Sequence, residues 1–161
     1  MVSLRFLVLI CFFCSFAYSP SLNAIIVGSL PITTIDIPAE PYATFFDLVQ
    51  DHNNVIYISH EKGVKVFDGS RWQDINIPDT YLTRMLYFDG VDRVYVGGFD
   101  FFGYINRNQY GIYQFTNLTP NKPHIEFASI WDIMACDKRI FFRALNHVFA
   151  LNPKSGEINS W

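Results

Sequence analysis

Short runs of alternating apolar and polar residues, separated by polar turns, fill the chain from residue 43 onward. In "GVKVFDG", Val64 and Val66 fall on one face of an extended segment, and Lys65 falls on the other. The Asp-Gly pair that follows favours a hairpin turn, because glycine accepts a positive φ. The runs are rich in Val, Ile, Tyr and Phe, and they show no convincing helical period. This pattern predicts an all-β chain.

The runs recur in blocks of four. Three blocks open with "VIYIS", "RVYVG" and "RIFFR", continue with "GVKVFD", "FGYIN" and "HVFALN", and close with "WQDI", "YQFTNL" and "INSW". A matching run precedes each block: "TFFDLVQD", "RMLYFDG" or "IWDIMACD". The core aromatics Tyr57, Tyr95 and Phe141 lie 38 and 46 residues apart. Units of four short strands in about 40 residues predict a β-propeller.

Each blade of a propeller buries its faces against neighbouring blades, and large flat side chains fill the wedge between the sheets. We expect this role for five aromatic residues: Tyr57, Trp72, Tyr95, Phe141 and Trp161. A β-sandwich is the alternative fold, although its strands need not recur in blocks of four.

The number of blades is small for a closed ring. Propellers close with about four to eight blades, whereas residues 43–161 hold about three, over 43–78, 79–120 and 127–161. An open arc leaves two apolar sheet faces in water. The sequence therefore predicts a truncated piece of a longer propeller, or else assembly with partner blades or in a receptor dimer.

The first 24 residues follow a different pattern. Arg5 precedes the apolar run "FLVLICFFC", and small residues come after it. This order is typical of a secretory signal peptide, and the run is short for a membrane span, which needs about 20 apolar residues. An uncleaved anchor is the alternative. We expect an exported, extracytoplasmic chain in which residues 25–42 form a linker with a lead-in strand.

Composition narrows the classes of function. Half of the residues are hydrophobic and 17% are aromatic, which is enough for a packed core and argues against disorder. The formal net charge is −3 and no basic run occurs, so nucleic acid is not an expected partner. Removal of the signal peptide would remove Cys11 and Cys14. Cys136 would remain, and we expect it to be a small core residue.

The segment "VIYISHEKGVKVFDGSRW" resembles the two-component regulator propeller repeat. In that repeat, an aromatic strand ending in a small residue is followed by Gly-Leu/Val, two residues, an aromatic residue and Asp-Gly. "RVYVGGFDFFGYI" is similar, with Gly97-Gly98 where the family usually has Gly-Thr. The third copy departs most, with Arg143-Ala144 at that place. The resemblance covers roughly residues 43–161.

The resemblance implies a periplasmic sensor propeller of a bacterial hybrid sensor kinase or diguanylate cyclase. Such propellers precede a membrane span and a cytoplasmic output module. These 161 residues contain no output module, so the resemblance implies a chain that lacks its output. Membrane association is expected only through the N-terminal segment or through a missing C-terminal part.

No spacing of residues singles out a catalytic or metal site, and no cofactor is expected. The histidines lack ligand spacing: His52, His60, His124 and His147. Asp89 and Asp92 suit a turn better than a Ca²⁺ site. Several carboxylates fit turns or strand edges, so no glycosidase pair stands out: Asp47, Glu61, Asp68, Asp74, Asp100 and Asp132. Ser70 and Ser155 fit turns as well.

Two loops are candidates for ligand binding, "SHEKG" (residues 59–63) and "GGFDFFG" (residues 97–103). Both mix polar groups with aromatic or apolar ones, as a sugar or peptide site does. The interpretation that we favour is that Phe99, Phe101 and Phe102 pack between blades. The sequence thus predicts a non-catalytic sensor for a small molecule or oligosaccharide. The alternatives are a secreted interaction scaffold and a propeller lyase or glycosidase.

Overall fold

A computed structural model describes residues 31–38, 41, 43–78, 82–120 and 126–161. The chain divides into two compact units, residues 1–35 and 36–161, and every described strand lies in the second. The expected signal peptide, with Cys11 and Cys14, lies outside the described residues. Within the described part, no helix is long and apolar enough to cross a membrane. Residues 31–38, which belong to the expected lead-in, form no strand.

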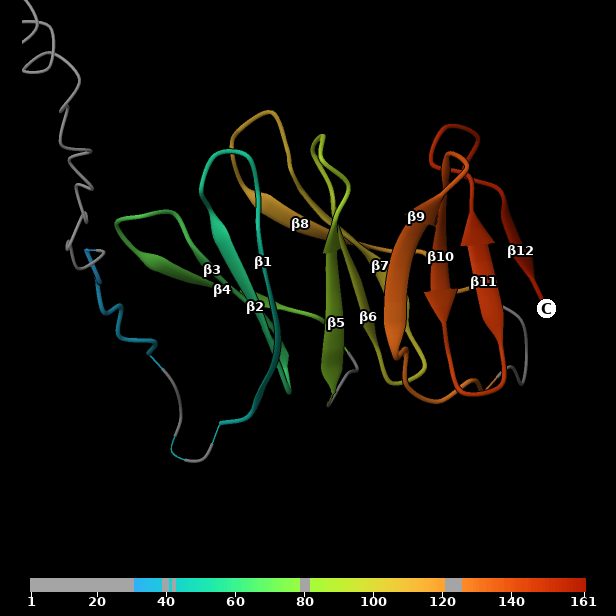
Figure 1. The fold of residues 1–161 in the computed structure, drawn as a ribbon, viewed down its shortest axis with the longest axis horizontal. Coiled ribbons are helices and arrows are strands. Elements are labelled where there is room, and N and C mark those ends of the chain that lie inside the picture. The colour runs from blue at the N-terminus through green and yellow to red at the C-terminus, as the bar shows by residue number, and fades with distance from the viewer. Residues whose placement is uncertain (1–30, 39–40, 42, 79–81, 121–125) are drawn as a thin grey trace, which may run out of the picture. The chain divides into compact units, whose positions relative to one another are not determined.

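The described strands form three four-stranded antiparallel sheets, each in simple chain order (Figure 1). The first sheet contains β1 (Phe45–Gln50), β2 (Ile56–His60), β3 (Gly63–Phe67) and β4 (Trp72–Asn76). The second contains β5 (Thr83–Phe88), β6 (Val94–Gly98), β7 (Phe102–Arg107) and β8 (Tyr113–Asn117). The third contains β9 (Asp132–Cys136), β10 (Arg139–Arg143), β11 (Val148–Leu151) and β12 (Ile158–Ser160). The all-β prediction and the three blocks of four strands are confirmed, and the arrangement is consistent with a partial β-propeller.

The first strands of the three sheets are neighbours in the order β1, β5 and β9. β1 contacts β5, and β5 contacts β9, while the later strands of each sheet extend away from them (Figure 1). This is the arrangement expected of inner strands around a propeller axis. One side-chain bond joins two of them: the Asp47 carboxylate on β1 accepts the backbone N–H of Leu86 on β5 at 2.8 Å.

Two apolar cores lie between successive sheets, and each is built from alternate residues of the strands. Between the first and second sheets, Val64 and Val66 pack in one cluster with Val96 and Ile105. Between the second and third sheets, the Phe102 ring lies 4.5 Å from that of Phe142 and 4.9 Å from that of Phe149. Because side chains alternate along a strand, β5, β6 and β7 of the middle sheet each supply residues to both cores.

The repeat explains which aromatic residues are buried. Tyr57 and Tyr95 are 5% and 0% exposed, and each belongs to the core that its sheet shares with the next one. Phe141 occupies the equivalent position in β10, where it pairs with Met134 and Ala150. Phe141 is only partly buried, because no further described sheet covers that face.

Three residues that we expected in a wedge or a core lie instead on sheet faces that no other described sheet covers, so those expectations are wrong. Trp161 is 67% exposed and Cys136 is exposed, because both lie on or beside the uncovered side of the third sheet. Trp72 lies on the uncovered side of the first sheet rather than between sheets. Its ring stacks on Phe67 with centroids 4.9 Å apart, and its indole N–H donates to the backbone carbonyl of Asp36 at 2.9 Å.

Most hairpin loops open with an Asp or Asn whose side-chain oxygen accepts backbone N–H groups further along the loop. This holds for Asp51, Asp68, Asp89, Asn108 and Asn152. In the tightest case, hydrogen bonds from the backbone of Arg71 and from Ser70 hold the pKa of Asp68 well below its usual range. The turn interpretations of Asp68 and Asp89 are therefore confirmed.

Removal of the Asp47 carboxylate should weaken the contact between the two inner strands. In the variant Asp47→Ala, the Leu86 N–H would lose its acceptor on an edge of β5 that β6 does not cover. Leaving a buried donor unpaired costs about 1–3 kcal/mol, and we expect that decrease in the free energy of urea unfolding. Asp92→Ala is the matched control, because the Asp92 side chain is 68% exposed. Equal stability of the two variants would contradict the prediction.

Candidate functional site

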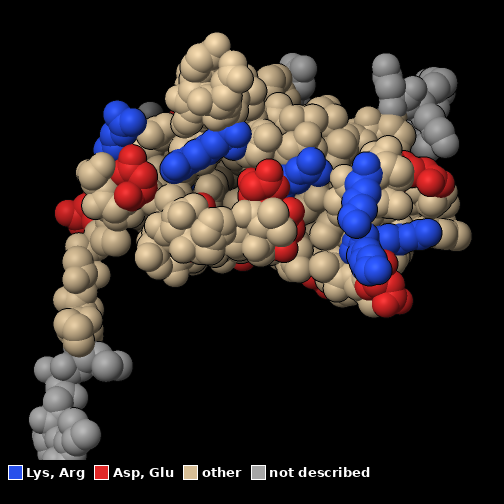
Figure 2. Space-filling view, turned by 90° about the horizontal axis from the view of Figure 1, so that it is seen from above, with Lys and Arg blue, Asp and Glu red and all other residues tan. Residues whose placement is uncertain are grey.

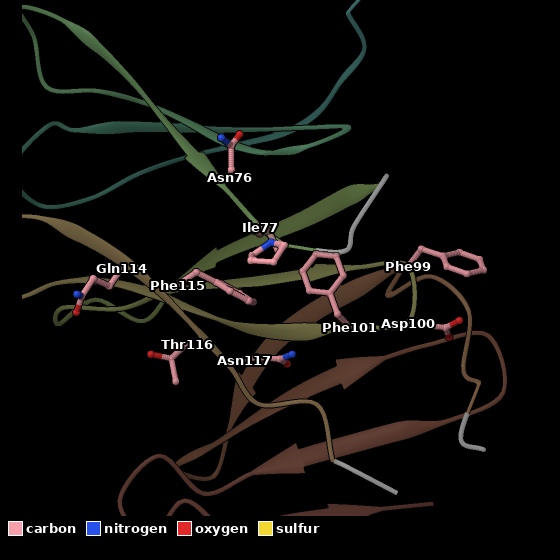
Figure 3. Close-up of a pocket in the computed structure, with 10 residues that line it drawn as sticks. Asn76, Ile77, Phe99, Asp100, Phe101, Gln114, Phe115, Thr116 and Asn117 are labelled. Carbon is pink, nitrogen blue, oxygen red and sulfur yellow. The ribbon is translucent and has the colours of Figure 1, made fainter. Parts of the chain in front are cut away.

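The candidate site is a pocket of about 810 Å³ between the outer strands of the first and second sheets. Residues at the end of β4 line one side, residues of β8 line the other, and residues 99–101 of the β6–β7 loop close one end (Figure 3). The pocket lies where two sheets diverge, because sheets that radiate from an axis separate toward their outer strands.

The apolar part of the pocket is an extension of the core between the first two sheets. Phe101 is 8% exposed, and its ring meets the Phe115 ring edge-on, with centroids 6.0 Å apart. Ile77 is 4% exposed and belongs to the same cluster. Phe101 and Ile77 are buried in this cluster, and Phe115 is partly buried against it, so packing within the core holds this wall of the pocket.

The polar part consists of uncharged side chains on the two outer strands. Asn76 and Gln114 are exposed, and Thr116 is partly buried. Figure 3 shows the side chains of Asn76 and Gln114 standing away from the three labelled phenylalanine rings. The Asn117 side-chain oxygen already accepts the backbone N–H of Thr119 at 2.9 Å. Alternation along β4 and β8 places the exposed amides of Asn76 and Gln114 on the strand faces opposite Ile75 and Phe115, where their donors and acceptors stand at the outer edges of the two sheets.

The loop at the end of the pocket is clamped by backbone hydrogen bonds to its neighbours. The Phe99 N–H donates to the Leu82 carbonyl at 3.0 Å, and the Ile130 N–H donates to the Gly98 carbonyl at 2.9 Å. The Asp100 carboxylate accepts the backbone N–H groups of residues 127 and 128 at 2.8 and 2.7 Å. Asp100 is therefore occupied in holding this loop against the segment that leads into the third sheet.

Glycine is required where this loop begins. A Cβ atom on Gly98 would overlap with the Phe101 ring and with the Leu82 carbonyl oxygen. A Cβ on Gly97 would lie 2.6 Å from Cγ2 of Ile130. The Gly-Gly pair, where the resembled repeat usually has Gly-Thr, thus permits close approach on both faces of β6.

Of the two loops proposed from the sequence as ligand-binding loops, one lines the pocket and the other does not. Residues 99–101 of "GGFDFFG" line the pocket. Phe101 and Phe102 are packing residues, 8% and 0% exposed, while Phe99 is 37% exposed. "SHEKG" does not line this pocket. Its Ser59 hydroxyl instead donates to the Arg84 carbonyl at 3.0 Å, which ties the first sheet to β5.

His60 of "SHEKG" belongs to a small charged group on the first sheet. The buried Lys65 ammonium lies 2.6 Å from the Asp74 carboxylate, and His60 Nε2 lies 3.8 Å from the same oxygen. Burial lowers the pKa of the His60 ring, and the charge of Lys65 acts in the same direction. The ring is therefore neutral near pH 7, where it forms no ion pair with Asp74.

The remaining carboxylates and histidines of the sequence analysis do not converge in the described residues. Asp132 lies 3.9 Å from Arg143, Glu61 is exposed, and His52 and His147 lie in separate hairpin or loop segments. His124 lies outside the described residues. No three His, Cys, Asp or Glu side chains of the described part gather as a set of metal ligands.

Charge is mixed on the face seen in Figure 2. Blue Lys and Arg side chains gather toward the end that the third sheet occupies, with red Asp and Glu side chains beside them. The third sheet and its loops carry both kinds: Arg139 and Arg143 as well as Asp132 and Asp137. The pocket wall on β8, by contrast, is uncharged.

Sequence reasoning missed the pocket residues on the outer strands. Asn76, Gln114 and Phe115 belong to runs that read only as the last strand of a block. Their alternation shows that neighbouring residues face opposite ways, but it does not show which two outer strands meet. Only the divergence of the first and second sheets brings β4 and β8 to one pocket.

No protein-family model matches the chain, and no curated protein matches it. It is similar in structure to the extracellular domain of BT4673 of B. thetaiotaomicron, described as a one component system, with a TM-score of 0.55 and 16% identity over 74% of this chain.

A second structure of the BT4673 extracellular domain, described there as a hybrid two component system, gives a TM-score of 0.54 and 17% identity, also over 74% of this chain. The chain spans only about one sixth of these solved chains, with 16% and 15% of their lengths covered. At this identity, the likeness shows a shared fold.

Adding one methyl group to Gly98 should disturb the loop and the pocket together. In Gly98→Ala, the new Cβ would overlap with the Phe101 ring and the Leu82 carbonyl, so one of them must move. Overpacking of this kind costs about 1–3 kcal/mol, measurable as a lower midpoint of urea unfolding. Gly90→Asn is the control, because Gly90 has open space around it and asparagine tolerates its φ of 79°. A Gly98→Ala protein as stable as wild type would show that the clamp is absent.

Proposed function

We propose that this chain is an extracytoplasmic, non-catalytic segment of a sensor propeller, and that its pocket binds a neutral oligosaccharide. The observation that carries the proposal is the pocket between β4 and β8, which combines an aromatic wall with an uncharged amide rim. The extracellular domains of similar fold support the sensor assignment.

The chemistry of the pocket suits a sugar better than a charged metabolite. A pyranose ring has an apolar C–H face that can lie against Phe101 or Phe115, and further sugar units that pass over the outer strands can bond to the exposed amides of Asn76 and Gln114. Asp100, the charged residue of the lining, is already bonded to two backbone N–H groups. A pocket of about 810 Å³ is large enough for a short oligosaccharide.

The position of the pocket suggests how binding would be sensed. Its walls belong to two different sheets, and its closing loop is bonded to the segment that enters the third. A ligand that contacts both walls would favour one arrangement of the sheets over another, by the difference in its affinity for the two. An output module that read this change would lie outside these 161 residues.

An interaction scaffold is the second candidate function. The uncovered side of the third sheet exposes Met134 and the terminal Trp161, which are 48% and 67% exposed. These two residues stand at opposite edges of the sheet, with Phe141 on the same face between them. Large exposed apolar residues spread over one sheet face are typical of a surface that associates with protein. A scaffold would need no ligand in the β4–β8 pocket, so ligand binding separates the two functions.

Loss of the rim amides should weaken binding of a neutral oligosaccharide. The chain would be screened against immobilised neutral glycans, and the affinity for the best one would be measured by calorimetry. Asn76→Ala and Gln114→Ala should each lower that affinity about 2- to 15-fold, the effect of losing one or two hydrogen bonds. Gln50→Ala, an exposed amide on β1, should bind like wild type. If no neutral glycan binds, the oligosaccharide assignment fails and the scaffold gains support.

Export by the N-terminal segment can be tested separately. Cells that express the whole chain should release it with the periplasmic fraction, because "FLVLICFFC" after Arg5 has the pattern of a signal peptide. A chain that lacks residues 2–24 should stay in the cytoplasm. Asp92→Glu, a substitution at an exposed side chain, is the control for expression level and cell fractionation. Retention of the whole chain in the cytoplasm would overturn the extracytoplasmic assignment.

A further inference from the structure

Three different side chains occupy one equivalent position of the repeat, on β1, on β5 and directly before β9. Phe46, Arg84 and Trp131 each stand two residues before a first-strand residue that pairs with the second strand of its sheet. Those later residues are Leu48, Leu86 and Ile133, which pair with Ile58, Val96 and Phe142. Because the sheets follow one another around the axis, equivalent positions come close together there.

Arg84 lies between the other two side chains. Its guanidinium carbon is 3.9 Å from the centre of the Trp131 ring and 5.8 Å from the centre of the Phe46 ring. Such contacts use the faces of the guanidinium group, and they leave the N–H donors around its edge available. We call these three residues the Arg84 cluster. It draws one residue from each sheet, so it exists only when all three sheets are in place.

The Arg84 cluster lacks a carboxylate of its own within the described part of the chain. The ion pairs found there involve other basic residues: His60, Lys65, Arg71, Arg93 and Arg143. Arg93 offers a direct comparison, because it also stacks on a ring, that of Tyr104 at 4.6 Å, but it has Asp92 at 3.9 Å. Arg84 stacks on Trp131 in the same way, but none of the ion pairs in the described residues involves it.

Exposure shows that a ligand could reach the cluster. The Trp131 side chain is 44% exposed, although it makes the closest contact with Arg84. Arg84 itself is only partly buried. A guanidinium held by stacking loses little conformational freedom when it binds, so its planar fork of donors is arranged in advance.

We propose that the Arg84 cluster binds a carboxylate-bearing small molecule, with an acidic sugar as the matching chemical class. The carboxylate accepts two hydrogen bonds from the edge of the Arg84 guanidinium, and the body of the ligand lies against the exposed Trp131 ring. A planar, singly charged group suits one guanidinium fork. The formal net charge of −3 disfavours a more highly charged ligand. This site is separate from the β4–β8 pocket, and it does not depend on the function proposed for that pocket.

Trp131 provides a fluorescence signal for the test. The chain has three tryptophans, so Trp72→Phe with Trp161→Phe leaves Trp131 as the sole one. In this background, glucuronate should change the emission saturably, and glucose, which has a hydroxymethyl group in place of the carboxylate, should not. Arg84→Met should lower the affinity for glucuronate at least about tenfold, as expected for a lost charge-assisted hydrogen bond. Arg93→Met is the control and should bind like the parent.

A second variant covers the case in which Arg84→Met does not fold. Arg84→Lys keeps the positive charge but loses the planar fork of donors, so it should bind glucuronate more weakly than the parent. Three results would overturn the proposal: an equal response to glucose and glucuronate, unchanged affinity in both Arg84 variants, or inorganic phosphate binding as tightly as glucuronate. The last result would show an unselective anion site instead of a carboxylate site.

Discussion

Face-to-face packing of successive sheets is the interaction on which the rest of this structure depends. Each sheet is only four short strands, and such a sheet cannot bury an apolar face alone. The middle sheet solves this by placing Val94 and Val96 in one core and Tyr95 in the other. The stacked rings of Phe102 and Phe142 add about 0.5–1.5 kcal/mol beyond the area that they bury.

The same packing creates both candidate binding sites. Sheets that touch near their first strands must diverge near their last ones, so β4 and β8 separate and leave the pocket between them. Near the axis the sheets converge, and there Phe46, Arg84 and Trp131 meet. One geometric constraint therefore yields an uncharged aromatic pocket at the outer side and a stacked cation at the inner side.

Packing also explains the side chains that look misplaced. Phe141 and Met134 stand on the side of the third sheet that no described sheet covers, and Cys136 and Trp161 are exposed at the same sheet. On the first sheet, Trp72 stacks on Phe67 and donates to the Asp36 carbonyl instead of entering a wedge. These residues occupy the positions that the repeat assigns to them. They are exposed because their sheets are the first and the third of the three described sheets, and each has one uncovered side.

The local structure follows from short-range patterns in the sequence. Runs such as "GVKVF" and "FGYIN" alternate with the period of two that a strand requires, so the strands and the blocks of four could be predicted. Asp and Asn side chains at the loops accept hydrogen bonds from the nearby backbone, so the turns at Asp68 and Asp89 could be predicted as well.

Which faces of different sheets meet depends on packing between segments that lie far apart in the sequence. The pocket joins Asn76 to Gln114, and the Arg84 cluster joins residues 46, 84 and 131, with separations of about one repeat that no local pattern specifies. Gly98 and Asp100 show the same limit, because their roles depend on contacts with Leu82 and with residues 127 and 128. Local hydrogen bonds act over a few residues, whereas packing acts between segments that the sequence alone does not place together.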